Sequence, residues 1–241
     1  MKVLINGAAG KMGQIAVQAI TTDQKLKLVG VAERGDNLRQ KIIDSKAEIV
    51  IDFTTAAVVF EQSQIIINSG ARPIIGTSGL SREQITALEK MCAEKKLGGI
   101  IVPNFSIGAV LMMRYAQEAA RYFPNAEIIE MHHNQKQDAP SGTAMKTAEL
   151  IANARNAPIH PLSEKELLPG ARGATLQQVP IHSVRLAGLL AHQIVVFGNQ
   201  GELLTIRHDT THREAFIAGI QLACHKVVDL KNLIYGLEHL I

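Results

Sequence analysis

The sequence predicts an α/β protein of two parts: a parallel sheet covered by helices, and an α+β part built on a mixed or antiparallel sheet. The first hundred residues alternate short apolar runs with longer amphipathic stretches, which is the pattern of repeated strand and helix. The apolar runs lack polar alternation, and this indicates strands buried on both faces, as in parallel sheets. After Phe105 the rhythm changes to long helical stretches and then to three strand-like runs.

In the first part, strands and helices alternate along the chain. The apolar runs predict strands in residues 2–6, 27–33, 48–54, 72–76 and 99–105. The amphipathic stretches predict helices in residues 11–20, 56–70 and 81–96. Ligands of such sheets bind at the carboxyl ends of the strands, and there this sequence places Gly and Pro.

The second part combines long helices with strands that turn residues separate. We expect, in order, a helix in 106–123, a strand in 126–133, a helix from about Thr143 to Arg155, a loop from Ala157 to Gly173, strands in 180–187, 192–199 and 202–209, and a helix in 213–228. The residues themselves leave open which part that last helix joins.

The composition is that of an ordinary globular protein of 241 residues, 46% of them hydrophobic, with a net charge of +3. Its basic residues are scattered and it has three Tyr and no Trp, so we expect an anionic small-molecule ligand and no nucleic acid. Cys92 and Cys224 lie far apart in apolar segments, which indicates reduced core thiols. No run has membrane-spanning length and the N-terminus lacks the apolar region of a signal peptide, so we predict a cytoplasmic protein without membrane contact.

A glycine-rich turn follows the first strand and opens the first helix. It comprises Gly7, Ala8, Ala9, Gly10, Lys11, Met12 and Gly13. Glycines there let the backbone approach a pyrophosphate, whose charge then meets the helix N-terminus. Glu33 lies twenty residues past Gly13, where an acid binds a ribose hydroxyl, and so the turn predicts a Rossmann-type dinucleotide site.

The cofactor of this site has two candidate forms. Glu33 favours NADH, whereas Arg34 beside it, with Lys11, could pair with the 2′-phosphate of NADPH, and we expect use of both. The motif alone does not separate nicotinamide from flavin. The structural alternative is a turn kept for packing, with Glu33 and Arg34 as solvated charges.

Two further loops follow strands at the same predicted edge. They contain Gly76, Thr77 and Ser78, and Val102, Pro103, Asn104 and Phe105. Loops in this position line the cofactor crevice. Taken without their position, the first is equally well a plain turn with a helix cap, and the second a loop with a buried aromatic ring.

The segment HHNQKQDAPSGTA, residues 132–144, combines a proton carrier, a cation and a helix start. Ser141 is a good N-cap, so we expect the N–H groups of Gly142, Thr143 and Ala144 to face open space. A carboxylate bound there would gain these donors, the helix dipole and the charge of Lys136.

Adjacent residues of a strand face opposite sides, so only one of His132 and His133 can address a given carbon. Histidine suits proton donation near neutral pH. The pair lacks the spacing of zinc ligands, His208 and His212 read as ordinary polar residues, and Ser141 lacks a nucleophile elbow. We therefore predict no metal site and no catalytic triad. Without the first part, a purely structural strand, turn and helix would be the favoured interpretation.

These motifs, GAAGKMG, GTSG, PNFSIG and EIIEMHHNQKQDAPSGTA in that order, closely resemble the dihydrodipicolinate reductase family over essentially the whole chain. The resemblance implies hydride transfer from NADH or NADPH to a cyclic imine dicarboxylate of the diaminopimelate route to lysine. It implies His132 as proton donor and Lys136 as its assistant and carboxylate ligand. His133, Ser141, Gly142 and Thr143 would hold the substrate.

The resemblance also implies an architecture: a dinucleotide-binding domain of residues 1–103 and 213–241, and an inserted substrate-binding and oligomerisation domain of residues 104–212. It implies a homotetramer formed through the sheet of the inserted domain. Some members carry Arg and His where this chain has Asn134 and Gln135, so less positive charge attracts the substrate here. The alternatives are a dehydrogenase of another small amino or keto acid, and a non-catalytic redox sensor, which would need a basic face or recognition helix.

Overall fold

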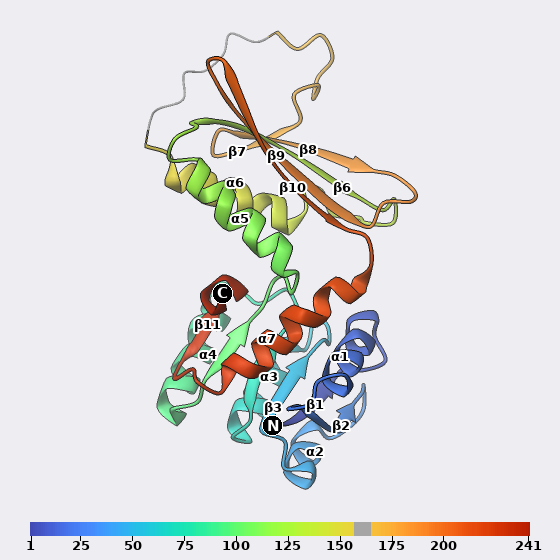
Figure 1. The fold of residues 1–241 in the computed structure, drawn as a ribbon. Helices are drawn as coiled ribbons and strands as arrows, with labels where there is room; N and C mark the ends of the chain where they lie inside the picture. The colour runs from blue at the N-terminus through green and yellow to red at the C-terminus, as the bar shows by residue number, and fades with distance from the viewer. Residues whose placement is uncertain (157–164) are drawn as a thin grey trace. The chain divides into compact units, whose positions relative to one another are not determined.

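A computed structural model describes residues 1–156 and 165–241 (Figure 1). The chain forms two compact units: unit 1 is Met1–Ile107 with Arg213–Ile241, and unit 2 is Gly108–His212. Part of the loop predicted from Ala157 to Gly173 lies outside the described residues.

Unit 1 is built on a parallel sheet of six strands in the order β11, β5, β4, β3, β1, β2. Their bounds are β1 Lys2–Asn6, β2 Lys27–Ala32, β3 Ile49–Asp52, β4 Arg72–Ile75, β5 Gly99–Ile101 and β11 Leu233–Tyr235. The inner strand β3 is buried along its whole length, whereas β2 at the edge is partly exposed. The parallel sheet predicted from unbroken apolar runs is confirmed.

Helices cover this sheet on both faces. They are α1 Lys11–Thr21, α2 Leu38–Ser45, α3 Val59–Asn68, α4 Arg82–Lys95 and α7 Ile217–Val227. Leu4 and Val50 pack against α2 and α3 on one face. On α7, Gln221 donates to the carbonyl of Ala19 in α1 at 2.9 Å, so the last helix belongs to unit 1.

Three elements of unit 1 were not predicted: α2, β11 and the 3-10 helix Leu237–Leu240. Helix α2 is short and polar, with only Leu38 and Ile42 buried, so its apolar face spans a single turn. Strand β11 has three residues and pairs in parallel with β5, which lies more than a hundred residues earlier. Helix α2 and strand β11 are both too short to produce a recognisable pattern of apolar residues in the sequence.

Unit 2 is a five-stranded sheet in the order β10, β9, β6, β8, β7, with α5 and α6 on one face (Figure 1). The bounds are α5 Ile107–Ala119, β6 Asn125–His132, α6 Gly142–Ala154, β7 Ala174–Leu176, β8 Val179–Arg185, β9 Ala191–Asn199 and β10 Glu202–Thr210. Strands β6 and β8 run parallel and the other pairs antiparallel, so the sheet is mixed. The buried side chains of Ile128, Val195 and Phe197 face the helices.

Gly13 fixes how closely α1 packs on the end of β1. A methyl group there would lie 2.1 Å from the carbonyl oxygen of Gly7, a backbone atom that cannot move aside. We expect Gly13→Ala to lower the free energy of unfolding by at least about 1–3 kcal/mol, the usual cost of overpacking.

Gly10→Ala is the matched control for this prediction, because its methyl group would meet the same oxygen at 3.4 Å, an ordinary contact. Urea denaturation of both variants gives the comparison. Equal stabilities would show that the backbone accommodates the clash.

Candidate active site

The glycine-rich turn forms an open cradle at the start of α1. Gly7 has φ +82°, and a methyl group there would lie 2.6 Å from the carbonyl oxygen of Phe53. Gly10 is the N-cap of α1, and no side chain caps this helix. Ala9, Gly10 and Lys11 are exposed. No side chain caps the first turn of α1, so an anion such as a pyrophosphate fits against the helix N-terminus.

The acid predicted to bind ribose lies at this cradle. Glu33 follows β2, and its Oε1 accepts a hydrogen bond from the backbone N–H of Ala9 at 2.6 Å. Its own N–H donates to Asp36, and Arg34 beside it is exposed. The fold thus brings Glu33 to the turn, twenty residues away in sequence, as the motif predicts.

The loops after β4 and β5 meet over two aromatic rings. Phe53 and Phe105 have ring centroids 5.4 Å apart, and a methyl group on Gly76 would lie 2.2 Å from the Phe53 ring. Val102 is buried and its N–H donates to the carbonyl of Ile75 at 2.8 Å. The remaining predicted residues of these loops, Thr77, Ser78, Pro103 and Asn104, follow the same strand ends.

A buried acid that was not predicted links three of the strand ends. Asp52 ends β3 and is 0% exposed. Its carboxylate accepts from Asn6 at the end of β1 at 2.8 Å, and from the hydroxyls of Thr54 and Thr77 at 2.8 and 2.7 Å. The sequence feature that could have indicated this residue is an acid at the end of an otherwise apolar strand. These contacts give the carboxyl edge of the sheet a fixed shape, and the residues along it fit a dinucleotide.

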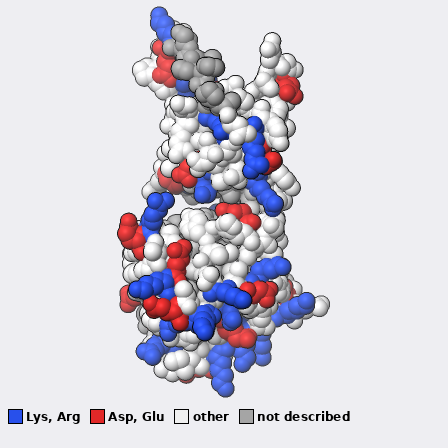
Figure 2. Space-filling model, turned by 90° about the vertical axis from the view of Figure 1, so that its left-hand side faces the viewer, with Lys and Arg blue, Asp and Glu red and all other residues white. Residues whose placement is uncertain are grey.

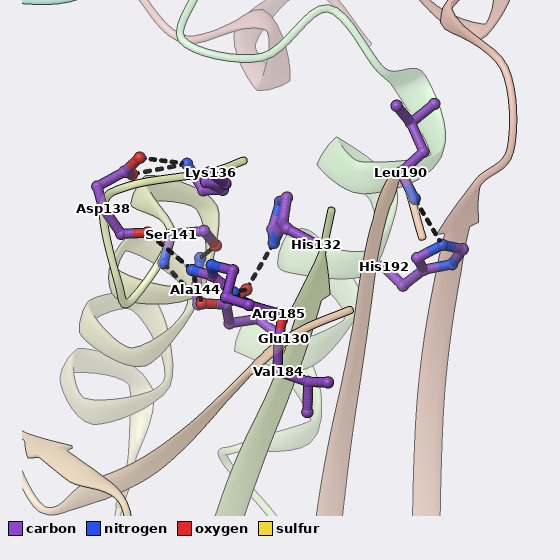
Figure 3. A network of polar contacts seen from close by, with 10 residues as sticks. All are labelled: Glu130, His132, Lys136, Asp138, Ser141, Ala144, Val184, Arg185, Leu190 and His192. Carbon is purple, nitrogen blue, oxygen red and sulfur yellow. Dashed lines mark hydrogen bonds and ion pairs between the residues drawn. The ribbon is translucent and has the colours of Figure 1, made fainter. Parts of the chain in front are cut away.

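In unit 2 the candidate site begins where β6 ends. His132 is the last residue of β6, and Glu130, two residues earlier, lies on the same face of the strand. The imidazole Nδ1 lies 2.5 Å from Glu130 Oε2 (Figure 3). Both terminal nitrogens of Arg185, on the adjacent strand β8, donate to the same carboxylate at 2.8 Å. The backbone N–H of Ser141 donates to it at 3.1 Å.

Glu130 is 0% exposed and nevertheless ionised. Burial opposes its charge, but hydrogen bonds from His132, Arg185 and Ser183 outweigh burial and hold the pKa of the carboxyl at about 2. A fixed negative charge therefore lies directly behind the imidazole.

The turn after β6 carries the predicted cation. Lys136 donates to both carboxylate oxygens of Asp138, at 2.8 and 2.6 Å, and this contact lowers the pKa of Asp138 below its ordinary value. Arg185 also donates to the backbone oxygen of Asp138 at 2.7 Å. An incoming carboxylate therefore competes with Asp138 for the donors of Lys136.

The start of α6 corrects one prediction. Ser141 is the N-cap, as expected, but its hydroxyl accepts from the N–H of Ala144 at 3.2 Å, so Ala144 does not offer its N–H to a ligand. The backbone at Gly142 faces open space, because a methyl group there would meet no atom within 4 Å. Thr143 follows in the first turn, and its carbonyl accepts from Thr147.

His133, the other predicted histidine, follows β6 directly. Its Nδ1 is buried and has no hydrogen-bond partner among the described residues. The fold thus places His132, His133, Lys136, Ser141, Gly142 and Thr143 around one strand end, turn and helix start. Figure 3 shows His132, Lys136 and Ser141 of this group. Within residues 1–156 and 165–241, no group of three or more His, Cys, Asp and Glu side chains could hold a metal ion, and no helix is long and apolar enough to span a membrane.

Two family models together match nearly the whole chain. The model for the N-terminus of dihydrodipicolinate reductase matches residues 1–105, and the model for its C-terminus matches residues 108–241. The chain belongs to the dihydrodipicolinate reductase family. It is an NAD(P)H-dependent reductase of the diaminopimelate route to lysine, so the family and the activity predicted from the sequence are confirmed.

Individual members of the family are similar to the chain from end to end. The 4-hydroxy-tetrahydrodipicolinate reductase of Legionella pneumophila (strain Paris) is 55% identical over 240 residues, which is 100% of this chain and 99% of the relative. A dipicolinate-bound dihydrodipicolinate reductase structure from Paenisporosarcina sp. TG-14 is 43% identical and superposes with a TM-score of 0.92, covering 100% and 99% of the chains. An apo scyllo-inositol dehydrogenase from Lactobacillus casei, 12% identical with a TM-score of 0.65 and coverage of 100% and 91%, shares the fold alone.

Two residues of this site, Glu130 and Arg185, were not predicted from the sequence. One signal was available for Glu130, an acid at an inward position of an apolar strand and two residues before a histidine. Arg185 is opposite His132 only through the parallel pairing of β6 with β8, which is 53 positions later in the chain. The spacing of residues in the sequence does not predict which strands pair.

The low pKa of Glu130 predicts a component of stability that depends on pH. The folded pKa of about 2 lies below the ordinary value of 4.5. The ionised carboxylate therefore stabilises the fold fully above pH 4.5, and this stabilisation is lost as the pH falls from 4.5 to 2. We expect the unfolding free energy of the wild type to fall more steeply over this range than that of Glu130→Gln, as urea denaturation would measure. Parallel curves would contradict an ionised, buried Glu130.

Proposed function

We propose that the chain reduces 4-hydroxy-tetrahydrodipicolinate, the substrate in the names of its relatives, with His132 as proton donor. The observation that carries the proposal is the convergence of an imidazole, an ammonium and an open helix start on one strand end. These are His132, Lys136 and the first turn of α6. Together they provide a proton source and two kinds of carboxylate ligand, which the reduction of a cyclic dicarboxylate requires.

The cofactor is held by unit 1. Its ligands would be Gly7, Ala8, Ala9, Gly10, Lys11, Met12, Gly13, Glu33, Arg34, Gly76, Thr77, Ser78, Val102, Pro103, Asn104 and Phe105. When bound, the nicotinamide supplies the hydride. We propose that NADH and NADPH both serve: Glu33, bonded to Ala9, is positioned for a ribose hydroxyl, and the exposed Arg34 beside it is available to a 2′-phosphate.

The residues of unit 2 hold the substrate and move the proton. Lys136 exchanges Asp138 for a substrate carboxylate, and the first turn of α6 at Gly142 and Thr143 adds N–H donors. Ser141 keeps that turn formed through its cap. His133 offers a ring nitrogen to the substrate next to this turn. The 4-hydroxyl of the substrate leaves as water, which gives the unsaturated cyclic imine. The ring carbon that carried the hydroxyl accepts the hydride, His132 gives a proton to the adjacent carbon, and solvent then reprotonates His132.

We propose a homotetramer assembled through the outer face of the unit 2 sheet, the face opposite α5 and α6. Alternation along the strands places Ile129 and Met131 of β6 and Ile194 and Val196 of β9 on this outer face, half-buried. Leu203 of β10 is 76% exposed beside them. These side chains form an apolar cluster on the outer face, and a cluster of this kind normally has a partner.

Figure 2 shows Lys, Arg, Asp and Glu interspersed on one view of the surface, without a field of a single sign. Recognition of nucleic acid by a basic face, which the redox-sensor alternative needs, has no support on that view. We place the enzyme in the cytoplasm, because Cys92 and Cys224 are free, buried thiols, which is typical of a reducing compartment.

The proton-donor role predicts the behaviour of His132→Ala. Its kcat should fall by roughly 10²–10⁴-fold, because general acid catalysis acts in the transition state. The KM for NADH should hardly change, since the dinucleotide binds to unit 1. The assay follows NADH or NADPH absorbance with the product of the preceding synthase as substrate and pyridine-2,6-dicarboxylate as inhibitor.

His225→Ala is the control, because that imidazole is also bonded to a carboxylate, Asp23 at 2.7 Å, but belongs to unit 1 and is not among the proposed cofactor ligands. It should keep wild-type kcat. Turnover retained by His132→Ala would remove His132 from the chemistry, and activity with only one of the two cofactors would contradict dual use.

The tetramer proposal predicts that Ile194→Asp, in the middle of the outer face, yields smaller species, because assembly would remove the new carboxylate from water. Light scattering after size-exclusion chromatography measures the mass of both proteins. Tyr122→Asp, at a side chain 70% exposed and outside this sheet, is the control and should remain a tetramer. A monomeric wild type, or a tetrameric Ile194→Asp, would overturn the proposal.

A further inference from the structure

We infer that Glu130, clamped by Arg185, is a positioning residue for the reaction: it accepts the Nδ1 proton of His132 and so presents Nε2 as the atom that delivers a proton. This inference rests on the proposed role of His132. It assigns a task to two residues outside the set of groups expected to contact substrate or cofactor.

The first argument is the position of Glu130 in the sheet. Along the inner face of β6 the preceding residues are Ala126 and Ile128, both part of the apolar core. An acid in that row loses its hydration and is tolerated only with a full set of partners. Glu130 has that set: two donors from Arg185, the N–H of Ser141, and the imidazole of His132. A purely structural position would be filled by an apolar residue at lower cost.

The second argument is the tautomer of His132. An ionised carboxylate only accepts hydrogen bonds, so the ring nitrogen that faces it must carry a proton. Nδ1 is that nitrogen, at 2.5 Å from Glu130 Oε2. In the neutral ring Nε2 is then the unprotonated atom, and in the charged ring Nε2 holds the proton that can be given away. The ring is also fixed in direction, which rapid proton transfer to carbon requires.

The third argument concerns Arg185. Its guanidinium binds both oxygens of Glu130 and, at the same time, the backbone oxygen of Asp138 at 2.7 Å. It therefore connects the strand that carries His132 with the turn that carries Lys136 (Figure 3). The carboxylate reaches the start of α6 in addition, through Ser141. One ion pair thus sets the relative positions of the proton donor, the cation and the helix start.

A second cluster of the same composition provides a matched control. Asp209 accepts from His192 Nδ1 and from Arg207, both at 2.7 Å, but it is an exposed residue on the edge strand β10. It has the same three chemical groups as the Glu130 cluster and no part in the proposed site. Asp209→Asn therefore measures what the loss of such a carboxylate costs without the positioning role.

The test is a double-mutant cycle on steady-state kinetics with four proteins: wild type, Glu130→Gln, His132→Ala, and the double variant. If Glu130 acts through His132, Glu130→Gln should lower kcat roughly 10- to 100-fold in the wild-type background. This is the usual effect of removing a residue that orients a functional histidine ring. In the His132→Ala background the same change should cost less than about twofold. Arg185→Lys, which keeps the charge and loses the fork, should show the same dependence on His132. Asp209→Asn should keep wild-type kcat.

A structural role would lower kcat by the same factor in both backgrounds, and that result overturns the inference alone. Full turnover of His132→Ala overturns the proton-donor role and this inference together, so the two failures are distinguishable. A measurement on the wild type needs no variant: long-range ¹⁵N correlation spectra about two pH units above the ordinary histidine pKa of ~6.5 should show the His132 proton on Nδ1. A proton on Nε2 would also overturn the inference.

Discussion

The buried carboxylate of Glu130 is the contact on which the site in unit 2 depends. A charge removed from water needs partners on every side, and here each partner comes from a different element: His132 from its own strand, Arg185 from β8, and Ser141 from the start of α6. Satisfying one desolvated group therefore fixes three elements relative to one another. The same charge that would destabilise an apolar sheet gives this one a unique arrangement at the strand end where the chemistry is proposed.

In unit 1 the proposed cofactor site is held in shape mainly by uncharged contacts. The turns at the carboxyl edge of its sheet are held by close backbone approach at Gly7 and Gly13 and by the neutral donors around Asp52. A dinucleotide carries its own negative charge, so its cradle needs N–H groups and an uncapped helix start more than it needs cations. The two units thus differ: in unit 1 the start of α1 has no side-chain cap, whereas in unit 2 hydrogen bonds surround the buried carboxylate of Glu130.

The comparisons separate fold from activity along the same line. A dehydrogenase of another substrate shares the overall fold although only about one residue in eight is identical to this chain. A reductase of the family is identical at about half of its residues. A parallel sheet with a glycine turn serves many substrates and does not identify one. The substrate chemistry that we propose depends on the segment from Glu130 to Ala144, which contains the imidazole, the ammonium and the helix start in one continuous stretch.

The sequence by itself determined the parallel sheet, the glycine turn and the N-cap at Ser141, because these depend on local periodicity and on residues within a few positions of one another. It also brought the family into view through contiguous motifs. Only the tertiary structure placed Arg185 against Glu130, added β11 to the sheet edge, and gave Lys136 a carboxylate partner in Asp138. Those contacts follow from strand pairing and from the direction of side chains, which carry no signal in the spacing of a single sequence.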